Sequence, residues 1–216
     1  MERAETIRRQ RLVRELRQQG IADPRVLEAM GSIPREKFVE EALEGAAYDG
    51  ALPIGQRQTI SQPRIVARMC ELAEPDGYGR ALEVGSGSGY HAAVLARLFE
   101  LVYSVERIPE LAELARRTVR GLGWENVHFK IFDGGYGWSE FAPYRAILVT
   151  AAAPRVPTPL VEQLEDGGRL ILPIAEGGVG GEQLLTRVTK AGGELRTESF
   201  ESCRFVPLLG RFGWSK

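Results

Sequence analysis

The sequence is poor in the residues that most often carry acid–base or metal chemistry. Its 216 residues include only two histidines and two cysteines. Cys70 and Cys203 are far apart, and neither has a second cysteine or a histidine close to it in the sequence, so no metal site is expected. His91 and His128 fall in an expected helix and an expected strand, where packing or a surface role is the simpler interpretation. We therefore expect chemistry that needs neither a metal ion nor a histidine base.

Long apolar runs and an excess of one charge are also missing. The sequence has no stretch of about 18 apolar residues that could cross a membrane. Its charged start, residues 1–5, lacks the apolar core of a secretory signal. The formal net charge is -1, so no basic field favours nucleic acid or an anionic membrane as a partner. We expect a cytoplasmic monomer with no nucleic-acid or membrane partner.

The first third of the chain predicts helices and loops. Apolar spacing, capping residues and prolines predict helices over 6–19, 25–30, 34–38 and 63–72. Glycines and prolines make the region 45–58 rich in turns. We expect residues 1–78 to form a helical cap with a substrate loop.

From residue 79 onward, short apolar runs alternate with helical segments. Strands are expected at 81–84, 101–106, 127–132, 146–150 and 169–173, and helices at 91–99, 109–121 and 159–164. This alternation predicts an α/β, Rossmann-like fold: a mostly parallel sheet with helices on both faces. Two further strands, 184–189 and 200–206, predict a hairpin at the sheet edge. We expect one domain over 1–216, with a cofactor-binding core at 79–175 and substrate-side strands at 176–216.

A glycine-rich loop follows the strand expected at 81–84 and precedes a helix. Glycine is needed where φ is positive or where a ligand approaches the backbone closely, and ligands of such sheets bind at the carboxyl ends of strands. The spacing G-x-G-x-G differs from the dinucleotide fingerprint. Glu83, just before the loop, would repel a pyrophosphate but suit a positively charged ligand such as S-adenosylmethionine. The candidate cofactor-binding residues here are Glu83, Gly85, Ser86, Gly87 and Gly89.

Two other strand ends carry carboxylates. Glu106 could accept both hydroxyls of a ribose, which S-adenosylmethionine and NAD share. Asp133, followed by Gly134, could offer its carboxylate to the exocyclic amine of adenine. These residues favour a nucleoside ligand, and a nicotinamide dehydrogenase stays open as an alternative.

One uncharged segment stands about twenty residues before the glycine loop. It runs Gln58-Thr59-Ile60-Ser61-Gln62-Pro63. Together with the glycine loop and the late Val206-Pro207-Leu208, it resembles the protein-L-isoaspartate O-methyltransferases. The resemblance covers most of the chain, including Ile33-Pro34-Arg35 and the segment 150–154.

The resemblance implies a seven-stranded methyltransferase sheet whose last strands are exchanged in order relative to most relatives. It implies S-adenosylmethionine as methyl donor, S-adenosylhomocysteine as product, and damaged proteins or peptides with L-isoaspartyl residues as partners. The methyl acceptor would be the free α-carboxylate, whose ester leads through a succinimide back to aspartyl. By resemblance, Ser61 is the catalytic residue. The peptide is gripped by Ser61, Gln62, Val206, Pro207 and Leu208, and the cofactor site also includes Gln58, Thr59, Ile60 and Arg107.

The expected acceptor explains why a base is not needed. An α-carboxyl group has a reference pKa of about 3.5, so it is already an anion at neutral pH. The hydroxyl of Ser61 can fix one carboxylate oxygen and leave the other free to react. An extended segment at 205–208 could also pair its free backbone groups with a peptide.

Three residues depart from the family pattern. Arg57 and Phe132 stand where family members often have glycine, and Arg145 replaces a usual aspartate at the start of the fourth strand, near the expected site. Arg145 keeps open a cofactor-binding protein with reduced or no activity. A methyltransferase acting on another carboxylate or on a nucleic acid base is the other open alternative.

Overall fold

The computed structural model describes residues 2–215. Its α-helices are α1 (Glu2–Gln18), α2 (Pro24–Ser32), α3 (Pro63–Leu72), α4 (Tyr90–Ala96), α5 (Pro109–Gly121) and α6 (Thr158–Glu162). Short 3-10 helices are η1 (Arg35–Phe38), η2 (Glu41–Ala46), η3 (Gly134–Tyr136) and η4 (Ser139–Phe141). The strands are β1 (Leu52–Pro53), β2 (Thr59–Ile60), β3 (Arg80–Val84), β4 (Leu101–Glu106), β5 (Val127–Ile131), β6 (Tyr144–Val149), β7 (Leu164–Ala175), β8 (Gln183–Ala191) and β9 (Glu194–Cys203).

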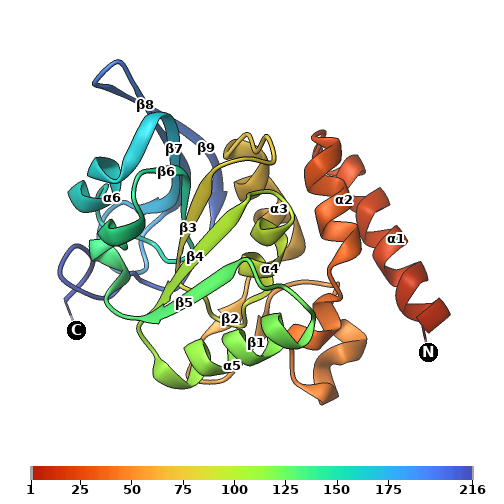
Figure 1. Cartoon of the computed structure of the whole chain (residues 1–216). Helices are drawn as coiled ribbons and strands as arrows, with labels where there is room; N and C mark the ends of the chain where they lie inside the picture. The colour runs from red at the N-terminus through yellow and green to blue at the C-terminus, as the bar shows by residue number, and fades with distance from the viewer. Residues whose placement is uncertain (1, 216) are drawn as a thin grey trace.

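A seven-stranded sheet forms the centre, in the order β5-β4-β3-β6-β7-β8-β9 (Figure 1). The first five strands of that order are parallel, and β8 runs antiparallel to both of its neighbours. Val84 pairs with Val105 on one side and with Val149 on the other, so β3, β4 and β6 end at the same edge of the sheet. The segments that follow these strands are therefore brought together there.

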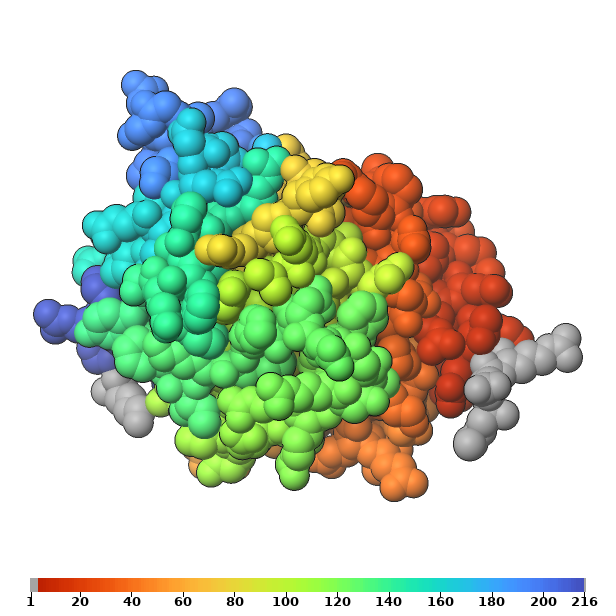
Figure 2. Space-filling view, viewed as in Figure 1, coloured from red at the N-terminus to blue at the C-terminus, as the bar shows by residue number. Residues whose placement is uncertain are grey.

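Alternate residues of a strand face opposite sides of the sheet, so a buried strand presents apolar side chains on both faces. Helices cover both of these faces. Ala81 and Ala146 join the apolar core shared with α1 to α5, whereas Leu82 and Ile147 join the core on the other face. α1 and α2 form an outer layer beside α3, and the tip of the β8–β9 hairpin projects on the opposite side of the molecule (Figures 1 and 2). No helix among residues 2–215 is long and apolar enough to span a bilayer.

The predicted α/β fold is confirmed, and several elements agree residue for residue. β4 and α5 occupy the predicted ranges. The turn-rich region 45–58 holds the end of η2 and β1, which pairs with β2 directly after this region. The prediction for the last strand is wrong. β9 begins at Glu194, directly after the hairpin turn, because Ala191 pairs with Glu194; it ends at Cys203 instead of reaching Val206. As an edge strand with exposed polar residues on both faces, its first half lacks the apolar alternation that predicts strands.

β7 is also longer than predicted. It begins at Leu164, five residues before the expected start, because Leu164 already pairs with Tyr144 of β6. The predicted helix at 159–164 therefore ends earlier, with α6 finishing at Glu162.

Candidate active site

The glycine loop is held in place by its neighbours on both sides. The Gly85 N–H donates to the Val105 carbonyl at 2.8 Å, and the Thr150 hydroxyl donates to the Gly85 carbonyl at 2.7 Å. Gly85 has φ +100°, and a Cβ there would overlap the Thr150 hydroxyl. Only glycine therefore fits this position without moving β6.

Glu106, at the end of β4, is fixed by main-chain donors. One carboxylate oxygen accepts from the Gly87 N–H at 3.0 Å, and the other accepts from the Ile108 N–H at 2.9 Å. A carboxylate offers about four acceptor positions, so each oxygen keeps one for a ligand. Two adjacent hydroxyls, as on a ribose, match this arrangement.

A first cavity opens at this edge of the sheet. It is lined by Arg57, Gln58, Thr59, Val84, Gly85, Gly87, Val105, Glu106, Arg107, Ile108, Gly134, Thr150, Ala151, Val206, Pro207, Leu208 and Leu209. The structure thus brings together most of the residues proposed for the cofactor. Val84, Val105 and Ile108 supply apolar walls beside the carboxylate of Glu106, a combination that suits an adenosine.

Glu83, in β3, and Ser86, within the loop, are buried and do not line the first cavity. The Glu83 side chain is fully buried and accepts a hydrogen bond from the Ser104 hydroxyl, which lies 2.6 Å from the Ser86 hydroxyl. Burial raises the pKa of Glu83 to about 8. Burial therefore favours the protonated form of Glu83, and its side chain lies outside the lining of the first cavity.

Three other candidate cofactor residues also lie outside the lining of this cavity. Gly89 caps α4 with φ +88°, and Ile60 is buried in the core. One oxygen of Asp133 accepts from the Gly135 N–H and the other from the Arg211 N–H, both at 2.9 Å. Asp133 therefore ties the C-terminal segment to η3, and it is the next residue, Gly134, that faces the first cavity.

Residues of the uncharged segment 58–63 line a second cavity. It is lined by Ala51, Thr59, Ser61, Gln62, Arg64, Ile65, Thr150, Ser202, Cys203, Arg204, Phe205 and Val206. The Ser61 hydroxyl makes no hydrogen bond with any residue among 2–215, so it is available to a ligand. Thr59, Thr150 and Val206 line both cavities and form the boundary between them.

The backbone of residues 205–208, after β9, has fewer unpaired hydrogen-bonding groups than the sequence analysis predicted. The Val206 carbonyl accepts from the Ala152 N–H, and the Leu208 N–H donates to the Ala152 carbonyl, both at 2.8 Å. Leu208 also accepts from the Trp214 N–H, and Pro207 has no N–H to give. The predicted pairing of 205–208 with a peptide is therefore restricted, because the fold already uses much of this backbone.

Two departures from the family pattern have clear places in the structure. Arg57 adopts φ +58°, the left-handed region that favours glycine, and it lines the first cavity with an exposed side chain. Phe132 is 42% exposed, packs near Tyr136 and lines neither cavity.

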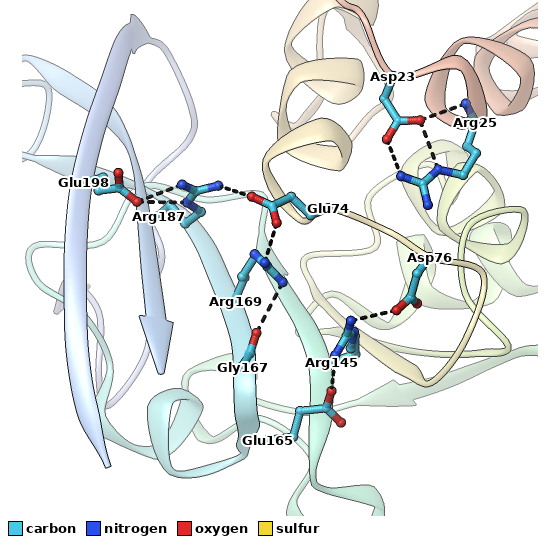
Figure 3. A network of polar contacts seen from close by, with 10 residues as sticks. All are labelled: Asp23, Arg25, Glu74, Asp76, Arg145, Glu165, Gly167, Arg169, Arg187 and Glu198. Atoms are coloured by element: carbon cyan, nitrogen blue, oxygen red, sulfur yellow. Dashed lines mark hydrogen bonds and ion pairs between the residues drawn. The ribbon is translucent and has the colours of Figure 1, made fainter. Parts of the chain in front are cut away.

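The expectation that Arg145 lies near the site is wrong. Arg145 stands next to Ala146, which pairs with Ala81 at the start of the parallel strands, whereas the first cavity lies beyond their ends. From Arg145 to Thr150 is roughly 16 Å, at about 3.3 Å per residue. Its guanidinium bonds Asp76 at 2.6 Å and Glu165 at 3.1 Å (Figure 3). A neighbouring network joins Glu74 to Arg169 and Arg187.

The most informative residue that the sequence did not single out is Thr150. It directly follows β6, in register with the end of β3, so the rule that ligands bind at strand ends would have predicted it. Arg64 and Arg204 of the second cavity carried no comparable signal, because segments far apart in the chain bring them together. Within residues 2–215, no group of three or more His, Cys, Asp or Glu side chains is placed to hold a metal ion.

Known proteins share this sequence and fold. The sequence profile of the family described as Protein-L-isoaspartate(D-aspartate) O-methyltransferase matches residues 7–213. A protein-L-isoaspartate O-methyltransferase from Syntrophus aciditrophicus (strain SB) is 50% identical over 202 residues, covering 93% of each chain. Another from Geobacter metallireducens is 51% identical over 211 residues, covering 96% of each chain.

Two solved structures agree with this assignment. A protein-L-isoaspartate O-methyltransferase matches with a TM-score of 0.85 and 35% identity, covering 95% of this chain and 67% of that one. A putative family member from Plasmodium falciparum, solved in complex with S-adenosyl-L-homocysteine, matches with a TM-score of 0.77 and 27% identity, covering 92% and 96% of the two chains. The resemblance expected from the sequence is confirmed, and the chain belongs to the protein-L-isoaspartate(D-aspartate) O-methyltransferase family.

Proposed function

We propose that this chain performs its family's reaction across the boundary between the two cavities. The enzyme transfers a methyl group from S-adenosylmethionine to the free α-carboxylate of an L-isoaspartyl residue in a damaged protein or peptide. The observation that carries the residue-level proposal is the shared wall of Thr59, Thr150 and Val206. On one side of it lie the strand ends that fit a nucleoside, and on the other lies the unpaired hydroxyl of Ser61.

The first cavity suits the methyl donor. Glu106 would hold the ribose hydroxyls, Gly85 and Gly87 allow close approach to the backbone, and Val84, Val105 and Ile108 would pack on the adenine. When bound, S-adenosylmethionine supplies a methyl group on a positively charged sulfur. Gln58, Thr59 and Arg107 also line this cavity, where they would contact the bound donor. Because the chain belongs to a methyltransferase family, a nicotinamide dehydrogenase is no longer an alternative function.

The second cavity positions the acceptor without deprotonating it. The Ser61 hydroxyl would donate to one oxygen of the acceptor carboxylate, which leaves the other oxygen free to attack. The lining also includes Gln62, another uncharged donor. A neutral donor is preferable here because a cation bonded directly to the reacting oxygen would lower its nucleophilicity.

Neither histidine is placed to serve as a base. His91 is buried in α4 with its Nε2 3.4 Å from the Cys70 Sγ, and burial lowers its pKa to about 4, so its ring is neutral at physiological pH. His128 packs against the ring of Tyr103, and neither histidine lines the first or the second cavity. This agrees with an acceptor that arrives already ionised.

The methyl ester then leads to repair. Attack of the neighbouring backbone nitrogen on the ester carbonyl expels methanol and closes a succinimide, whose hydrolysis gives aspartyl or isoaspartyl residues. The enzyme acts as a cytoplasmic monomer in which the cap (1–78), the core (79–175) and the C-terminal strands (176–216) work as one domain, without nucleic acid as a partner.

The test is methyl transfer from S-adenosylmethionine labelled in its methyl group. The purified protein is incubated with an isoaspartyl peptide, and the product is treated with mild base. The proposal expects label in the peptide that base releases as methanol, because a carboxyl methyl ester is base-labile. Label that resists base, or no label at all, would contradict it.

A further inference from the structure

Arg35 of η1 is an arginine with no access to solvent. Its exposed fraction is 0%, and no carboxylate among the side chains described, those of residues 4–215, forms an ion pair with it. Burial lowers the pKa of this guanidinium, and an unpaired buried charge is costly unless hydrogen bonds compensate it. Backbone carbonyls accept from Nε and Nη2, whereas Nη1 is buried without a hydrogen-bond partner. The side chain therefore connects separate loops.

The three carbonyls belong to Ala47, Gly50 and Ser61, and of these residues Ser61 lines the second cavity. The Arg35 Nε donates to the Ala47 carbonyl at 2.5 Å, and Nη2 donates to the carbonyls of Gly50 at 2.9 Å and Ser61 at 2.7 Å. The guanidinium thus spans from the loop after η2 to the residue whose hydroxyl faces the acceptor. A planar group with five fixed donors sets the relative position of these carbonyls.

The same guanidinium also contacts the helix that follows the glycine loop. Its central carbon lies 4.7 Å from the centre of the Tyr90 ring, and Tyr90 is 1% exposed. Tyr90 is the first residue of α4, directly after Gly89. One side chain therefore joins the backbone of Ser61 to the element that carries the cofactor loop.

We propose that Arg35 is a positioning residue that holds Ser61 at a fixed place relative to the first cavity. The inference rests on the proposed function, because it assigns Arg35 a role through Ser61 and no contact with the substrate. A displacement of about 1 Å in a positioned group can cost on the order of a hundredfold in rate. Arg35 should therefore affect methyl transfer more than it affects cofactor binding.

The test compares Arg35→Met and Arg35→Lys with a remote control, Arg169→Met. Methionine fills much of the space but removes the donors to all three carbonyls. Lysine keeps the charge but cannot serve three carbonyls and the ring together. Arg169 is a suitable control because it bonds Glu74 and the Gly167 carbonyl, away from both cavities.

We expect kcat/KM for an isoaspartyl peptide to fall about a hundredfold in Arg35→Met and about tenfold in Arg35→Lys. The Kd of S-adenosylhomocysteine should change less than about threefold, since no atom of Arg35 lines the first cavity. Arg169→Met should keep both values. An equal loss of peptide turnover and cofactor affinity in the Arg35 variants, or no loss of either, would overturn the inference.

Hydrogen exchange gives a readout that does not depend on activity. In Arg35→Lys, amides of 47–62 should exchange faster than in the parent protein, while those of β3 and β4 keep their protection. Unchanged exchange of 47–62 would contradict the role of Arg35 even if no peptide were methylated. Absence of transfer by the parent protein, with faster exchange in the variant, would contradict only the proposed function.

Discussion

The Thr150 hydroxyl donates a hydrogen bond to the Gly85 carbonyl at 2.7 Å, and Thr150 lines both cavities. This contact fixes the cofactor loop to the end of β6 at the boundary where methyl transfer is proposed. Movement of the loop at Gly85 would therefore break this hydrogen bond or displace Thr150.

Gly85→Ala should therefore impair cofactor binding. The new Cβ would overlap the Thr150 hydroxyl, and φ +100° is unfavourable for alanine. We expect the Kd of S-adenosylhomocysteine, measured by calorimetry, to rise at least about thirtyfold, which corresponds to about 2 kcal/mol. Gly192→Ala is the matched control, because Gly192 has φ +59° in the hairpin turn with nothing within 4 Å. Equal Kd values for the two variants would argue against a cofactor at this loop.

Glu106→Gln should also weaken the binding of S-adenosylhomocysteine, for a different reason. A carboxamide has one acceptor oxygen, so it cannot accept from the Gly87 and Ile108 N–H groups with separate oxygens and still serve two ribose hydroxyls. The loss of charged hydrogen bonds, each worth about 1.5–3 kcal/mol, predicts a Kd about 10- to 100-fold higher. Glu110→Gln, in the first turn of α5, should leave the Kd unchanged.

Arg145→Asp should alter stability and leave the reaction unchanged. The aspartate would face Asp76 and Glu165 in place of the two ion pairs of Arg145. We expect the free energy of unfolding to fall by about 1–3 kcal/mol, measured by urea titration, with kcat/KM within about twofold of the parent. Activity that appears only in the Arg145→Asp variant would instead support the reading of this chain as an inactive cofactor-binding protein.

Glu83 should make stability fall as the pH rises from about 4.5 to about 8. Burial raises its pKa from the ordinary 4.5 to about 8, so the native protein keeps a proton that the unfolded chain releases. Its contribution is complete below pH 4.5 and is lost as the pH rises through about 8. His91 has a pKa lowered from 6.5 to about 4, so it makes stability rise with pH. This rise is confined to pH values below about 6.5.

The window from pH 6.5 to 8 therefore isolates Glu83. The free energy of unfolding of the parent should fall by roughly 2 kcal/mol across it, at up to about 1.4 kcal/mol per pH unit. Glu83→Gln, which cannot ionise, should show a much smaller fall. Parallel curves for the two proteins would mean that Glu83 is ionised in the native state.

The sequence predicted the interior of the fold better than its edge. Leu101–Glu106 and Pro109–Gly121 were found where expected because buried strands and amphipathic helices have clear apolar periods. The bounds of the edge strand β9 were predicted wrongly because its polar residues pair with β8 through backbone hydrogen bonds, which leave no apolar pattern in the sequence.

The candidate site shows the same division. Glycines and strand-end acids predicted the region of the first cavity, yet the sequence could not reveal that Glu83 is buried beneath it or that Asp133 is occupied by backbone donors. It also could not show that Ala152 already pairs with Val206 and Leu208. These facts depend on contacts between distant segments.

Ser61→Ala tests how the second cavity works. Removing the hydroxyl takes away one hydrogen bond to a charged acceptor, worth about 1.5–3 kcal/mol, so kcat/KM for an isoaspartyl peptide should fall about 10- to 100-fold. The Kd of S-adenosylhomocysteine should stay the same, because Ser61 does not line the first cavity. Ser139→Ala, in η4, serves as a control expected to change neither value.

The most direct measurement is kcat/KM for two peptides that differ only in one linkage, isoaspartyl in one and normal aspartyl in the other. In the first, the free carboxylate is the α-carboxylate at a branch of the main chain; in the second, it is the side-chain carboxylate. Our account predicts methyl ester formation on the isoaspartyl peptide and no detectable transfer to its aspartyl twin. Equal transfer to both peptides, or transfer to neither under conditions where S-adenosylhomocysteine binds, would contradict it.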